Sequence, residues 1–304
     1  MKVLIIGGNG FIGSHLIDQL LIDGHDIRVF DIAYERYRKP LANVDYRIST
    51  LDNIPDLYEA LLGIDIVFHL ASSTVPSTSN IDTVSDINKN LIPTLNLLNL
   101  MVKLGIRRIV YFSSGGAIYG FPKTIPIPED HQLHPISSYG IIKATVEMYL
   151  YLYQRSYRIK PLIIRPSNPY GPRQGHYMAQ GVISTFLRKA KLKESLVIFG
   201  DGNSKKDYIY INDLIQACTQ LSFSDEIGTF NIGSGNCFSI NEIVSEIKET
   251  TGEEIFTVNS EMQKYDVDHF ELDISKLKKI IGDFDCISLN AGIKKTWNWI
   301  KNSD

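Results

Sequence analysis

The sequence predicts a doubly wound parallel α/β sheet followed by a smaller α+β lobe. Through the first half of the chain, short apolar runs typical of buried strands alternate with amphipathic stretches typical of helices. This alternation builds a parallel sheet joined by crossover helices. After about Pro166 the alternation loosens into mixed short elements. We therefore expect a first domain at 1–166 and a second at 167–304, and we leave open an exchange of chain segments between them.

The N-terminal strand, turn and helix form the most informative unit of the sequence. An apolar strand at 2–6 enters a turn that holds Gly7, Gly10 and Gly13, an amphipathic helix follows, and the next strand ends in Asp31. The first two glycines let backbone N–H groups approach a pyrophosphate at the helix N-terminus, and the third lets helix and strand pack closely. Asp31 can accept both ribose hydroxyls of an adenosine, which favours NAD over NADP. The unit predicts a Rossmann-type NAD-binding domain.

The other elements of the first domain repeat this pattern. The helix expected at about Val84–Leu104 contains Pro93, which has no backbone N–H, so we expect a break or bend near it. A proline-rich loop at 122–135 precedes a helix that begins near Ser137 or Ser138. The remaining strands are expected at Asp26–Asp31, Val44–Ile48, Asp65–Leu70, Arg108–Phe112 and Pro161–Arg165, and a further helix at Pro55–Leu62.

The second domain is expected to contain helices and short strands in mixed order. Ser239 with Glu242 fits a capping box at the start of one helix, and Asn290 is a candidate cap for the last helix. We expect helices at Gln180–Lys191, Asn212–Leu221, Ile240–Thr250 and Leu289–Lys301, and strands at Leu196–Phe199, Thr229–Ile232 and Glu254–Val258.

Composition and charge narrow the class of protein. A hydrophobic content of 44% and a charged content of 21% are ordinary for a globular protein, and a net charge of −3 makes no electrostatic case for nucleic acid. The N-terminal apolar run stops at Gly7, too short for a signal-peptide core or a membrane span, so we expect a cytoplasmic protein with no membrane partner. The cysteines and histidines lack metal-ligand spacing, so we expect no metal and three buried free thiols, Cys218, Cys237 and Cys286.

Tyr139 and Lys143 are the strongest catalytic candidates. Four residues apart on a helix, their side chains share a face. A phenol has an unperturbed pKa of about 10, which is too high for an efficient base at neutral pH. A neighbouring ammonium and an oxidised nicotinamide ring would both favour the phenolate. The alternative is a surface pair on an amphipathic helix, but this pair follows a dinucleotide-type turn and a strand that ends in serines.

Motifs that carry a family resemblance run from Lys2 to about Asp273. They are Gly7–Gly13, His69–Ala71, Ser113–Gly120, Tyr139 with Lys143, Arg165–Pro172, and Phe199–Gly202 with Lys206–Tyr210. Together they resemble the extended short-chain dehydrogenase/reductases. Within that superfamily the chain is most similar to the NAD-dependent nucleotide-sugar epimerase/dehydratase group, of which UDP-glucose 4-epimerase is the type member.

The resemblance implies how the site would work in a 4-epimerase. Tyr139 takes the proton of the sugar 4-hydroxyl while C4 gives hydride to NAD, the 4-keto sugar turns over, and hydride returns to the opposite face. Ser114 would hydrogen-bond the 4-oxygen, and Lys143 the nicotinamide ribose. Cofactor contacts would fall on Gly7, Gly10, Phe11, Ile12, Asp31, Leu51, Leu70, Ala71, Asn90, Ser113, Tyr139, Lys143 and Pro166, and substrate contacts on Ser114, Asn168, Lys206 and Phe270.

The sequence departs from the family pattern at the turn after the fifth strand. The family places its catalytic Ser or Thr four residues before Tyr119, where Gly115 stands, so we assign that role to Ser114. The alternative is that the serines only satisfy backbone groups at the strand end. The dehydratase subgroup carries an Asp-Glu pair where Gly116 and Ala117 stand, which argues against 4,6-dehydration.

The expected nucleotide and sugar contacts depart from the pattern as well. One arginine that family members place on the diphosphate is Lys206 here, and a second falls on Gln263. A lysine keeps the charge but loses the bidentate fork, and a glutamine loses the charge. Arg173 or Lys205 could compensate. Phe270 matches the family's gate beside the hexose C2 substituent and favours a plain hexose, although a core role for this side chain stays open.

The same residues support three hypotheses about function and one about assembly. The leading hypothesis is a UDP- or dTDP-hexose 4-epimerase that serves surface-polysaccharide precursor synthesis. The alternative is a reductase of a 4-keto-6-deoxy nucleotide sugar with exchangeable NAD(P)H, and a non-catalytic dinucleotide sensor is a third interpretation. The resemblance also implies a homodimer formed through the helix that bears Tyr139 and the long helix near Leu95.

Overall fold

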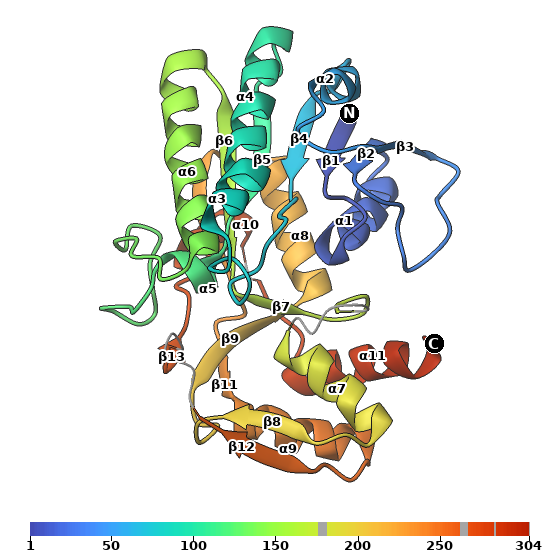
Figure 1. Ribbon diagram of the computed structural model, residues 1–304, viewed down its shortest axis with the longest axis vertical. Coiled ribbons are helices and arrows are strands. Elements are labelled where there is room, and N and C mark those ends of the chain that lie inside the picture. The colour runs from blue at the N-terminus through green and yellow to red at the C-terminus, as the bar shows by residue number, and fades with distance from the viewer. Residues whose placement is uncertain (176–180, 262–266, 283, 304) are drawn as a thin grey trace. The chain divides into compact units, whose positions relative to one another are not determined.

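The computed structural model describes residues 1–175, 181–261, 267–282 and 284–303 (Figure 1). The chain folds as two compact units, and neither unit is a continuous segment. The first contains residues 1–120, 132–165 and 215–230, and the second contains residues 121–131, 166–214 and 231–304. Residue 166, the predicted domain boundary, begins one segment of the second unit. The assignment of these units to cofactor and to substrate binding remains a prediction.

A seven-stranded sheet forms the centre of the first unit, in the order β10-β6-β5-β4-β1-β2-β3. The pairs from β6 through β3 are all parallel. In the middle of the sheet, Ile5 lies between Val29 and Phe68 of the two neighbouring strands. The strands are β1 (Lys2–Ile6), β2 (Asp26–Asp31), β3 (Val44–Ile48), β4 (Ile66–His69), β5 (Arg108–Phe112), β6 (Lys160–Pro166) and β10 (Gly228–Ile232).

This sheet confirms the predicted Rossmann-type, doubly wound fold. The strands expected at 2–6, 26–31, 44–48 and 108–112 form with the predicted bounds. The segment Thr229–Ile232 is a correction, because we expected it in the second domain and it lies in β10, beside β6 at the edge of the seven-stranded sheet. A short buried strand has the same sequence pattern in either sheet, so the pattern alone could not assign it.

Helices pack apolar faces against the sheet of the first unit. Fully buried Leu4 and Val67 on the strands meet Leu97, Leu98 and Val146 on the helices in one hydrophobic core. Burial of each such side chain stabilises the fold by about 1.5–3 kcal/mol. The helical elements are α1 (Phe11–Ile22), α2 (Ile54–Leu61), α3 (Thr83–Asp86), the π-helical turn η1 (Ile87–Leu91), α4 (Ile92–Leu104), α5 (Gly115–Ile118), α6 (Ser138–Tyr157) and α8 (Ile211–Ser222).

The long helix predicted at 84–104 is interrupted, as Pro93 led us to expect. The π turn η1 separates α3 from α4, and Pro93 lies in the first turn of α4, where its missing N–H leaves no hydrogen bond unmade. π turns of this kind frequently occur at functional sites because they re-aim neighbouring side chains. Here the turn carries Asn90, one of the predicted cofactor contacts.

Within its described residues, the second unit contains two small sheets and four further helices. Four of its strands were not expected from the sequence, because they are two to six residues long and lack a clear apolar period. They are β7 (Asn168–Tyr170), β9 (Lys205–Tyr210), β11 (Cys237–Ser239) and β13 (His269–Phe270). The strands expected in this region are β8 (Leu196–Phe199) and β12 (Thr257–Ser260), the latter displaced toward the C-terminus from the predicted 254–258. The helices are α7 (Val182–Leu192), α9 (Ile240–Thr251), α10 (Ser275–Ile281), which was not expected, and α11 (Leu289–Asn302).

The helix caps in the second unit agree with the sequence at one end and correct it at another. Ser239 and Glu242 form the predicted capping box at the start of α9. The cap of α11 is Ser288, whose hydroxyl accepts from the N–H of Ala291, and not Asn290. The Asn290 amide instead donates to Glu246 on α9. The predicted start of α7, Gln180, lies outside the described residues.

All three cysteines are free thiols, as expected. Cys218 is fully buried, whereas Cys237 and Cys286 are half-buried, which corrects the expectation that all three are buried. Across the described ranges, we find no helix with the length and apolar character that a membrane crossing requires.

We expect Ser288→Ala to lower the free energy of unfolding by about 1 kcal/mol, because the first turn of α11 loses its only side-chain acceptor. Chemical denaturation followed by far-UV circular dichroism measures the change. A second variant, Asn290→Ala, keeps Ser288 and removes only the exposed bond to Glu246, so it is expected to change stability less. A loss in Asn290→Ala as large as that in Ser288→Ala would return the cap to Asn290.

Candidate active site

The glycines of the first turn have the geometry that the sequence predicts. Gly7 has a φ of 80°, and a Cβ there would lie 2.7 Å from the backbone nitrogen of Ala71, so only glycine fits. A Cβ on Gly13 would lie 2.5 Å from the carbonyl oxygen of Gly7, so α1 and the turn are in direct contact. The turn therefore holds α1 close against the end of β1.

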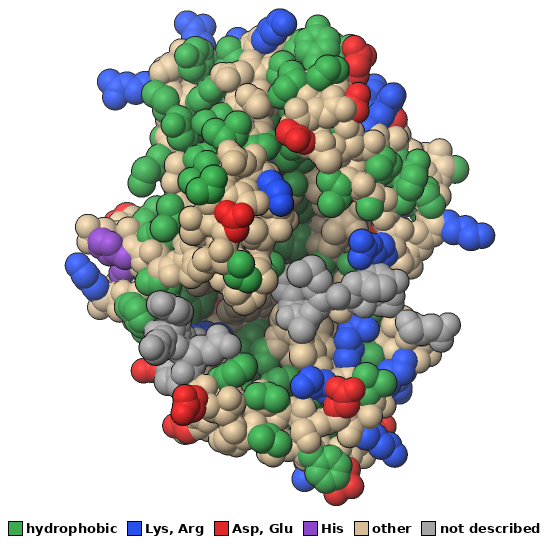
Figure 2. Space-filling model, viewed as in Figure 1, with side chains coloured by type: hydrophobic (Ala, Val, Ile, Leu, Met, Phe, Trp, Pro, Cys, Tyr) green, Lys and Arg blue, Asp and Glu red, His purple; other side chains and the backbone are tan. Residues whose placement is uncertain are grey.

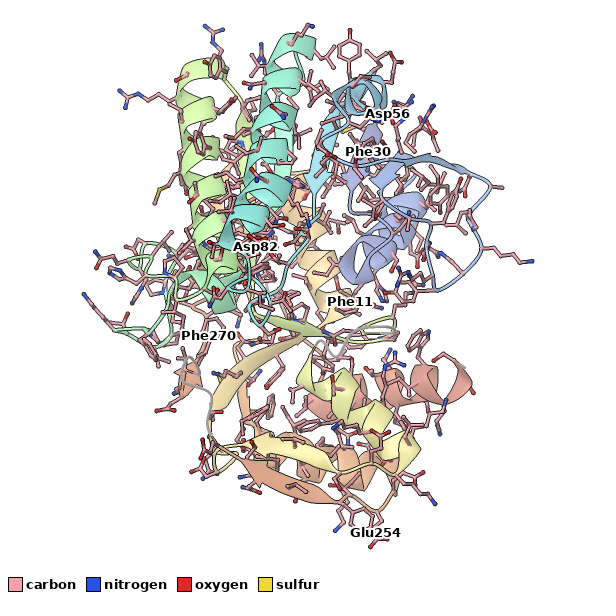
Figure 3. All side chains as sticks on the ribbon, in the orientation of Figure 1. Phe11, Phe30, Asp56, Asp82, Glu254 and Phe270 are labelled. Atoms are coloured by element: carbon pink, nitrogen blue, oxygen red, sulfur yellow. The ribbon has the colours of Figure 1, made fainter. Side chains whose placement is uncertain are left out.

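The N-terminus of α1 is open for an anion. Gly10 is the N-cap residue and provides no side-chain acceptor, so the first N–H groups of the helix, at Phe11 and Ile12, have no intrahelical partner. The partial positive charge of the helix N-terminus favours a phosphate there. Phe11 begins α1 (Figure 3). The N–H of Gly7 itself donates to Phe30 O at 3.0 Å, so Gly7 contributes through its shape and not through its own donor.

A cavity of about 700 Å³ opens beside this turn. Its volume lies within the roughly 300–1,000 Å³ range of sites that bind small molecules and cofactors. Ser113, which follows β5, has a buried hydroxyl with no hydrogen-bond partner among the described residues. The cavity and the open helix N-terminus fit a dinucleotide. The predicted cofactor contacts that line the cavity are Gly7, Gly10, Asp31, Leu51, Leu70, Ala71 and Asn90.

Asp31 lies at the end of β2 and lines the cavity, as a ribose acceptor should. Its two carboxylate oxygens accept from the N–H of Asn9 at 2.9 Å and from its neighbour Ile32 at 2.7 Å. Burial raises the pKa of Asp31, against the effect of these backbone donors. Each carboxylate oxygen keeps a further lone pair, so the side chain can still accept from hydroxyl groups.

The basic segment after β2 is organised by acids. The Arg38 guanidinium pairs with Asp18 and, at 3.0 Å, with Glu35. These pairs commit Arg38 to the protein, so it is not the 2′-phosphate ligand that NADP would require. Arg36 lines the cavity.

Tyr139 and Ser114 meet at the ends of two different elements. Ser137 caps α6 by accepting from the N–H of Gly140, which places Tyr139 in the first turn of the helix. Ser114 precedes the short helix α5 but its hydroxyl makes no capping hydrogen bond. That hydroxyl instead hydrogen-bonds the Tyr139 phenol. Ser114, one residue before Gly115, therefore reaches the phenol despite the double glycine.

The side chains around Tyr139 raise its pKa to about 12, so the expected phenolate would have to be favoured by the bound cofactor. Burial is the main cause, the Asp86 carboxylate adds to it, and the hydrogen bond from Ser114 opposes it. The ammonium of Lys143 lies 5.6 Å from the centre of the Tyr139 ring. The side chains alone thus hold Tyr139 protonated at neutral pH.

Lys143 is anchored to the backbone beside Tyr139. Its ammonium donates to the carbonyl oxygen of Phe112 at 2.7 Å and lies 4.9 Å from the centre of the Tyr111 ring. Burial lowers its pKa to about 8, while the carboxylates of Glu147 and Asp86 raise it. Lys143 is therefore largely charged at neutral pH but close to the point at which it loses its proton.

Asp86 connects three segments of the site and was not predicted from the sequence. It is fully buried at the end of α3 and accepts from Thr74 at 2.7 Å, Asn90 at 2.7 Å and Ser138 at 2.6 Å. A cavity of about 10 Å³ is lined by Asp86, Tyr139 and Lys143, and also by residues of the larger cavity. Asp86 stands four residues before Asn90, so both side chains lie on one face of the helix. This spacing was the signal in the sequence that could have identified Asp86.

Asn90 lines the cavity, but its polar atoms are committed to the protein. The side-chain oxygen accepts from Ser73 N at 2.8 Å, and the amide nitrogen donates to Asp86 and to the Ser73 hydroxyl. The residue thus fixes the loop after β4. Its predicted contact with the cofactor would be made by the remaining surface of the side chain.

His69, the last residue of β4, is a second residue that the sequence analysis did not assign. Its Nε2 lies 2.9 Å from the Thr94 hydroxyl, which itself donates to Asn90 O at 2.6 Å. Thr94 must therefore accept, so we assign the proton to Nε2. Burial lowers the pKa of His69 to about 3, which keeps it neutral. Its Nδ1 is a buried acceptor with no partner in the described part of the chain.

Three of the four predicted substrate contacts, Asn168, Lys206 and Phe270, lie on neighbouring strands of the second unit. In that sheet Asn168 on β7 pairs with Tyr208 of β9, and Phe270 on β13 pairs with Lys206 of β9. The Asn168 amide donates to Asp207 O at 2.8 Å, and the Lys206 ammonium donates to Val267 O.

Phe270 is only 4% exposed, so its side chain is part of the interior of the second unit. Gln263, the expected second departure, lies outside the described residues. Pro166 is the last residue of β6. The roles predicted for these side chains toward a ligand remain predictions.

The chain is similar to known proteins over most of its length, and this similarity identifies its family. Residues 3–233 match the model of the NAD dependent epimerase/dehydratase family. The chain belongs to this family. It is therefore an NAD-dependent enzyme of the extended short-chain dehydrogenase/reductase type, as the motifs led us to expect.

Similar proteins include epimerases of the same length. The chain is 36% identical to a protein of Methanocaldococcus jannaschii provisionally named a UDP-glucose 4-epimerase, over 99% of each chain. The Thermotoga maritima UDP-glucose 4-epimerase solved with UDP-glucose superposes with a TM-score of 0.94, 34% identity and 99% coverage of both chains. The Thermus thermophilus UDP-glucose 4-epimerase complex with NAD gives 0.93, 29% identity and 100% coverage of both. Other relatives are UDP-glucuronic acid decarboxylases, such as that of Xenopus tropicalis at 29% identity, which covers 99% of this chain and 72% of that protein.

We expect Asp86→Asn to lower the pKa of Lys143 from about 8 by about one unit or more, because a buried carboxylate that favours the ammonium is removed. NMR titration of protein labelled with ¹³C-lysine measures this pKa, with the resonance assigned by Lys143→Arg. The matched control is Asp82→Asn, which changes an exposed acid at the N-cap of α3 (Figure 3) and keeps a side chain that caps well. A Lys143 that titrates at the same pH in wild type and Asp86→Asn would contradict the assignment.

Proposed function

We propose that the chain is an NAD-dependent nucleotide-sugar 4-epimerase that acts on a UDP- or dTDP-hexose through a 4-keto intermediate. The observation that carries the proposal is the hydrogen bond between Ser114 and Tyr139, in a cavity that Tyr139 shares with Lys143. A hydroxyl, a phenol and an ammonium together can bind a carbinol oxygen and move its proton. The similarity to UDP-glucose 4-epimerases over nearly the whole chain supports the same reaction.

The side chains divide the work on the sugar 4-oxygen. Tyr139 takes the proton of the 4-hydroxyl when the keto group forms and returns it when the hydroxyl is restored. Ser114 stabilises the phenolate, since its hydrogen bond lowers the pKa of Tyr139. Lys143, fixed to Phe112 O, supplies positive charge beside the pair. Bound NAD supplies the hydride acceptor and a positive ring that also favours the phenolate.

The cofactor residues of the first unit fit this role. The open N-terminus of α1 suits a pyrophosphate, and Asp31 suits the adenosine ribose. Asn90 and Asp86 hold the loop at 71–74 that borders the same cavity. Because Arg38 is paired with two acids, NAD is favoured over NADP.

The substrate residues proposed for the second unit are Asn168 and Lys206, with Phe270 behind them. Lys206 keeps the charge that a nucleotide diphosphate requires, and an ammonium binds phosphate as a point charge where arginine would form a fork. The proposal places the product in the supply of precursors for surface polysaccharides.

We expect Tyr139→Phe to lower kcat by roughly 100- to 10,000-fold, because the proton-transfer group is lost while the ring is kept. Ser114→Ala should lower kcat less and move the acid limb of the pH profile to higher pH, since it removes the hydrogen bond that lowers the pKa of Tyr139. NMR of UDP-glucose and UDP-galactose interconversion, repeated with the dTDP sugars, measures the rates. Tyr157→Phe, at the C-terminal end of the same helix, is the control and should retain wild-type activity.

The cofactor content of the purified protein separates this proposal from the alternatives. NAD that stays bound through purification supports epimerisation, because the same cofactor must be reduced and reoxidised in each cycle. A protein that interconverts none of these hexoses but oxidises NADPH with a 4-keto-6-deoxy nucleotide sugar is the reductase. Release of CO₂ from UDP-glucuronic acid would instead assign the activity of the decarboxylases in the family.

The proposal extends to assembly as a homodimer through α4 and α6. The two helices lie side by side in the first unit, and Figure 2 shows apolar side chains gathered over them. Ile141, Met148 and Leu152 follow one face of α6 and are 51%, 62% and 50% exposed, and Ile92 on α4 is 45% exposed. Exposed apolar surface of this kind is typical of interaction sites.

We expect Leu152→Glu to raise the dissociation constant of the dimer at least about tenfold, which corresponds to about 1.4 kcal/mol, because a charge is buried without a partner. Sedimentation equilibrium measures this constant. Leu192→Glu, on α7 of the second unit, changes another exposed leucine (64% exposed) and should leave the constant unaltered. A wild-type protein that sediments only as a 34.3 kDa species at micromolar concentration would contradict the dimer.

A further inference from the structure

Cys237 comes together with His269 and Glu271 in the second unit although more than thirty residues of sequence separate the cysteine from the other two. Cys237 begins β11, His269 begins β13, and Glu271 follows β13 directly. Both strands flank β9. Cys237 pairs with Asp207 of β9, and His269 pairs with Lys205 of β9. The register of one small sheet therefore gathers a thiol, an imidazole and a carboxylate.

The distances within this cluster match those between ligands of one metal ion. The thiol sulfur lies 3.7 Å from Glu271 Oε2, and His269 Nε2 lies 3.5 Å from the same oxygen. One atom from each of the three residues lies within 4.8 Å of the others. Zinc with bonds of about 2.0–2.3 Å places neighbouring tetrahedral ligands roughly 3.3–3.8 Å apart. Two of the three edges already have this length.

We propose that Cys237, His269 and Glu271 form a binding site for a divalent transition metal of the zinc class. Thiolate and imidazole select this class, whereas Mg²⁺ and Ca²⁺ prefer sites made of oxygen. The side chains of His269 and Glu271 are 44% and 26% exposed, so a fourth ligand can come from solvent. This site departs from the sequence expectation of no metal, which considered only ligands close together in the chain.

The charges around the thiol determine how the site fills. Burial raises the pKa of Cys237, and the carboxylates of Asp207 and Glu271 raise it further, while Lys205 opposes them. The thiol is therefore protonated at neutral pH and donates to Phe270 O at 3.3 Å. A metal must displace this proton, so binding releases about one proton and strengthens as the pH rises.

The metal would cross-link strands that few hydrogen bonds join. β13 is two residues long, and its register pairs His269 and Phe270 with β9. A metal held by Cys237 from β11 and by the residues on both sides of Phe270 would tie β13 and β11 together across β9. Figure 3 labels Phe270 on this strand. The proposed role is to stabilise the second unit, and it does not depend on the reaction proposed for the first.

Cobalt is the probe for this site, because a thiolate bound to Co²⁺ gives a charge-transfer absorption band that oxygen and nitrogen ligands do not give. The full chain is treated with a chelator, exchanged into metal-free buffer with a reductant that does not bind metals, and titrated with Co²⁺. Zn²⁺ affinity is then measured by displacement of Co²⁺. We expect a stoichiometry of one metal per chain, and a melting temperature that rises on addition of Zn²⁺.

Variants decide which thiol binds. Cys237→Ser should abolish the charge-transfer band, whereas Cys286→Ser, which changes another half-buried thiol of the same unit, should retain it. His269→Gln and Glu271→Gln keep the thiol and should keep the band while weakening Zn²⁺ affinity. Loss of a partner that only orients a ligand already weakens binding roughly 10–100-fold, so loss of a ligand should weaken it at least as much.

Three results would overturn the proposal. The first is a wild-type chain that binds Co²⁺ without a charge-transfer band. The second is a band that survives Cys237→Ser or disappears in Cys286→Ser. The third is wild-type affinity in both His269→Gln and Glu271→Gln. Circular dichroism and the melting temperature of each metal-free variant establish that the fold is retained, so a loss of binding can be assigned to the ligand.

Discussion

The candidate active site depends on a buried carboxylate. Asp86 is the common acceptor for a loop, a π-helical turn and the start of α6, through Thr74, Asn90 and Ser138. A buried carboxylate is strongly disfavoured unless donors surround it, so these three segments can reach their lowest free energy only together. The loop borders the larger cavity and α6 carries Tyr139 and Lys143. The larger cavity and the proposed proton-transfer group are therefore both connected to one acceptor.

Burial, with a smaller contribution from the same carboxylate, explains why Tyr139 is not a ready-made base. Asp86 disfavours the phenolate of Tyr139 and favours the ammonium of Lys143, and burial opposes both charged forms. The side chains thus maintain a neutral phenol and a charged lysine at neutral pH. A positive charge beside Tyr139 would instead favour the phenolate. In the proposed reaction, the oxidised ring of bound NAD would supply that charge.

Much of the first unit could be predicted from the sequence, because its determinants are local. Strands that are buried on both faces are continuous apolar runs, and the glycines of the turn have a fixed spacing. Pro93 lies two residues after the π turn η1 and so indicates where the long helix is interrupted. The sequence indicated Ser114 as the substitute for the serine or threonine of the family. Its hydrogen bond to Tyr139 could not be predicted, because it depends on how α5 and α6 pack. Asp86 and His69 were missed because their partners are recognised only in three dimensions. The segment Thr229–Ile232 was assigned to the wrong sheet for the same reason.

The candidate active site and the proposed metal site differ in how the chain brings their residues together. Tyr139 and Lys143 share a helix, so one turn of backbone fixes their relation and a family motif can record it. Cys237 is brought to His269 and Glu271 by the register of β11 and β13 on β9. A shift of either strand by one residue would turn its ligand to the opposite face of the sheet and dismantle the cluster. Such a site leaves no spacing motif, and it can arise or disappear while the catalytic motif of the first unit stays unchanged.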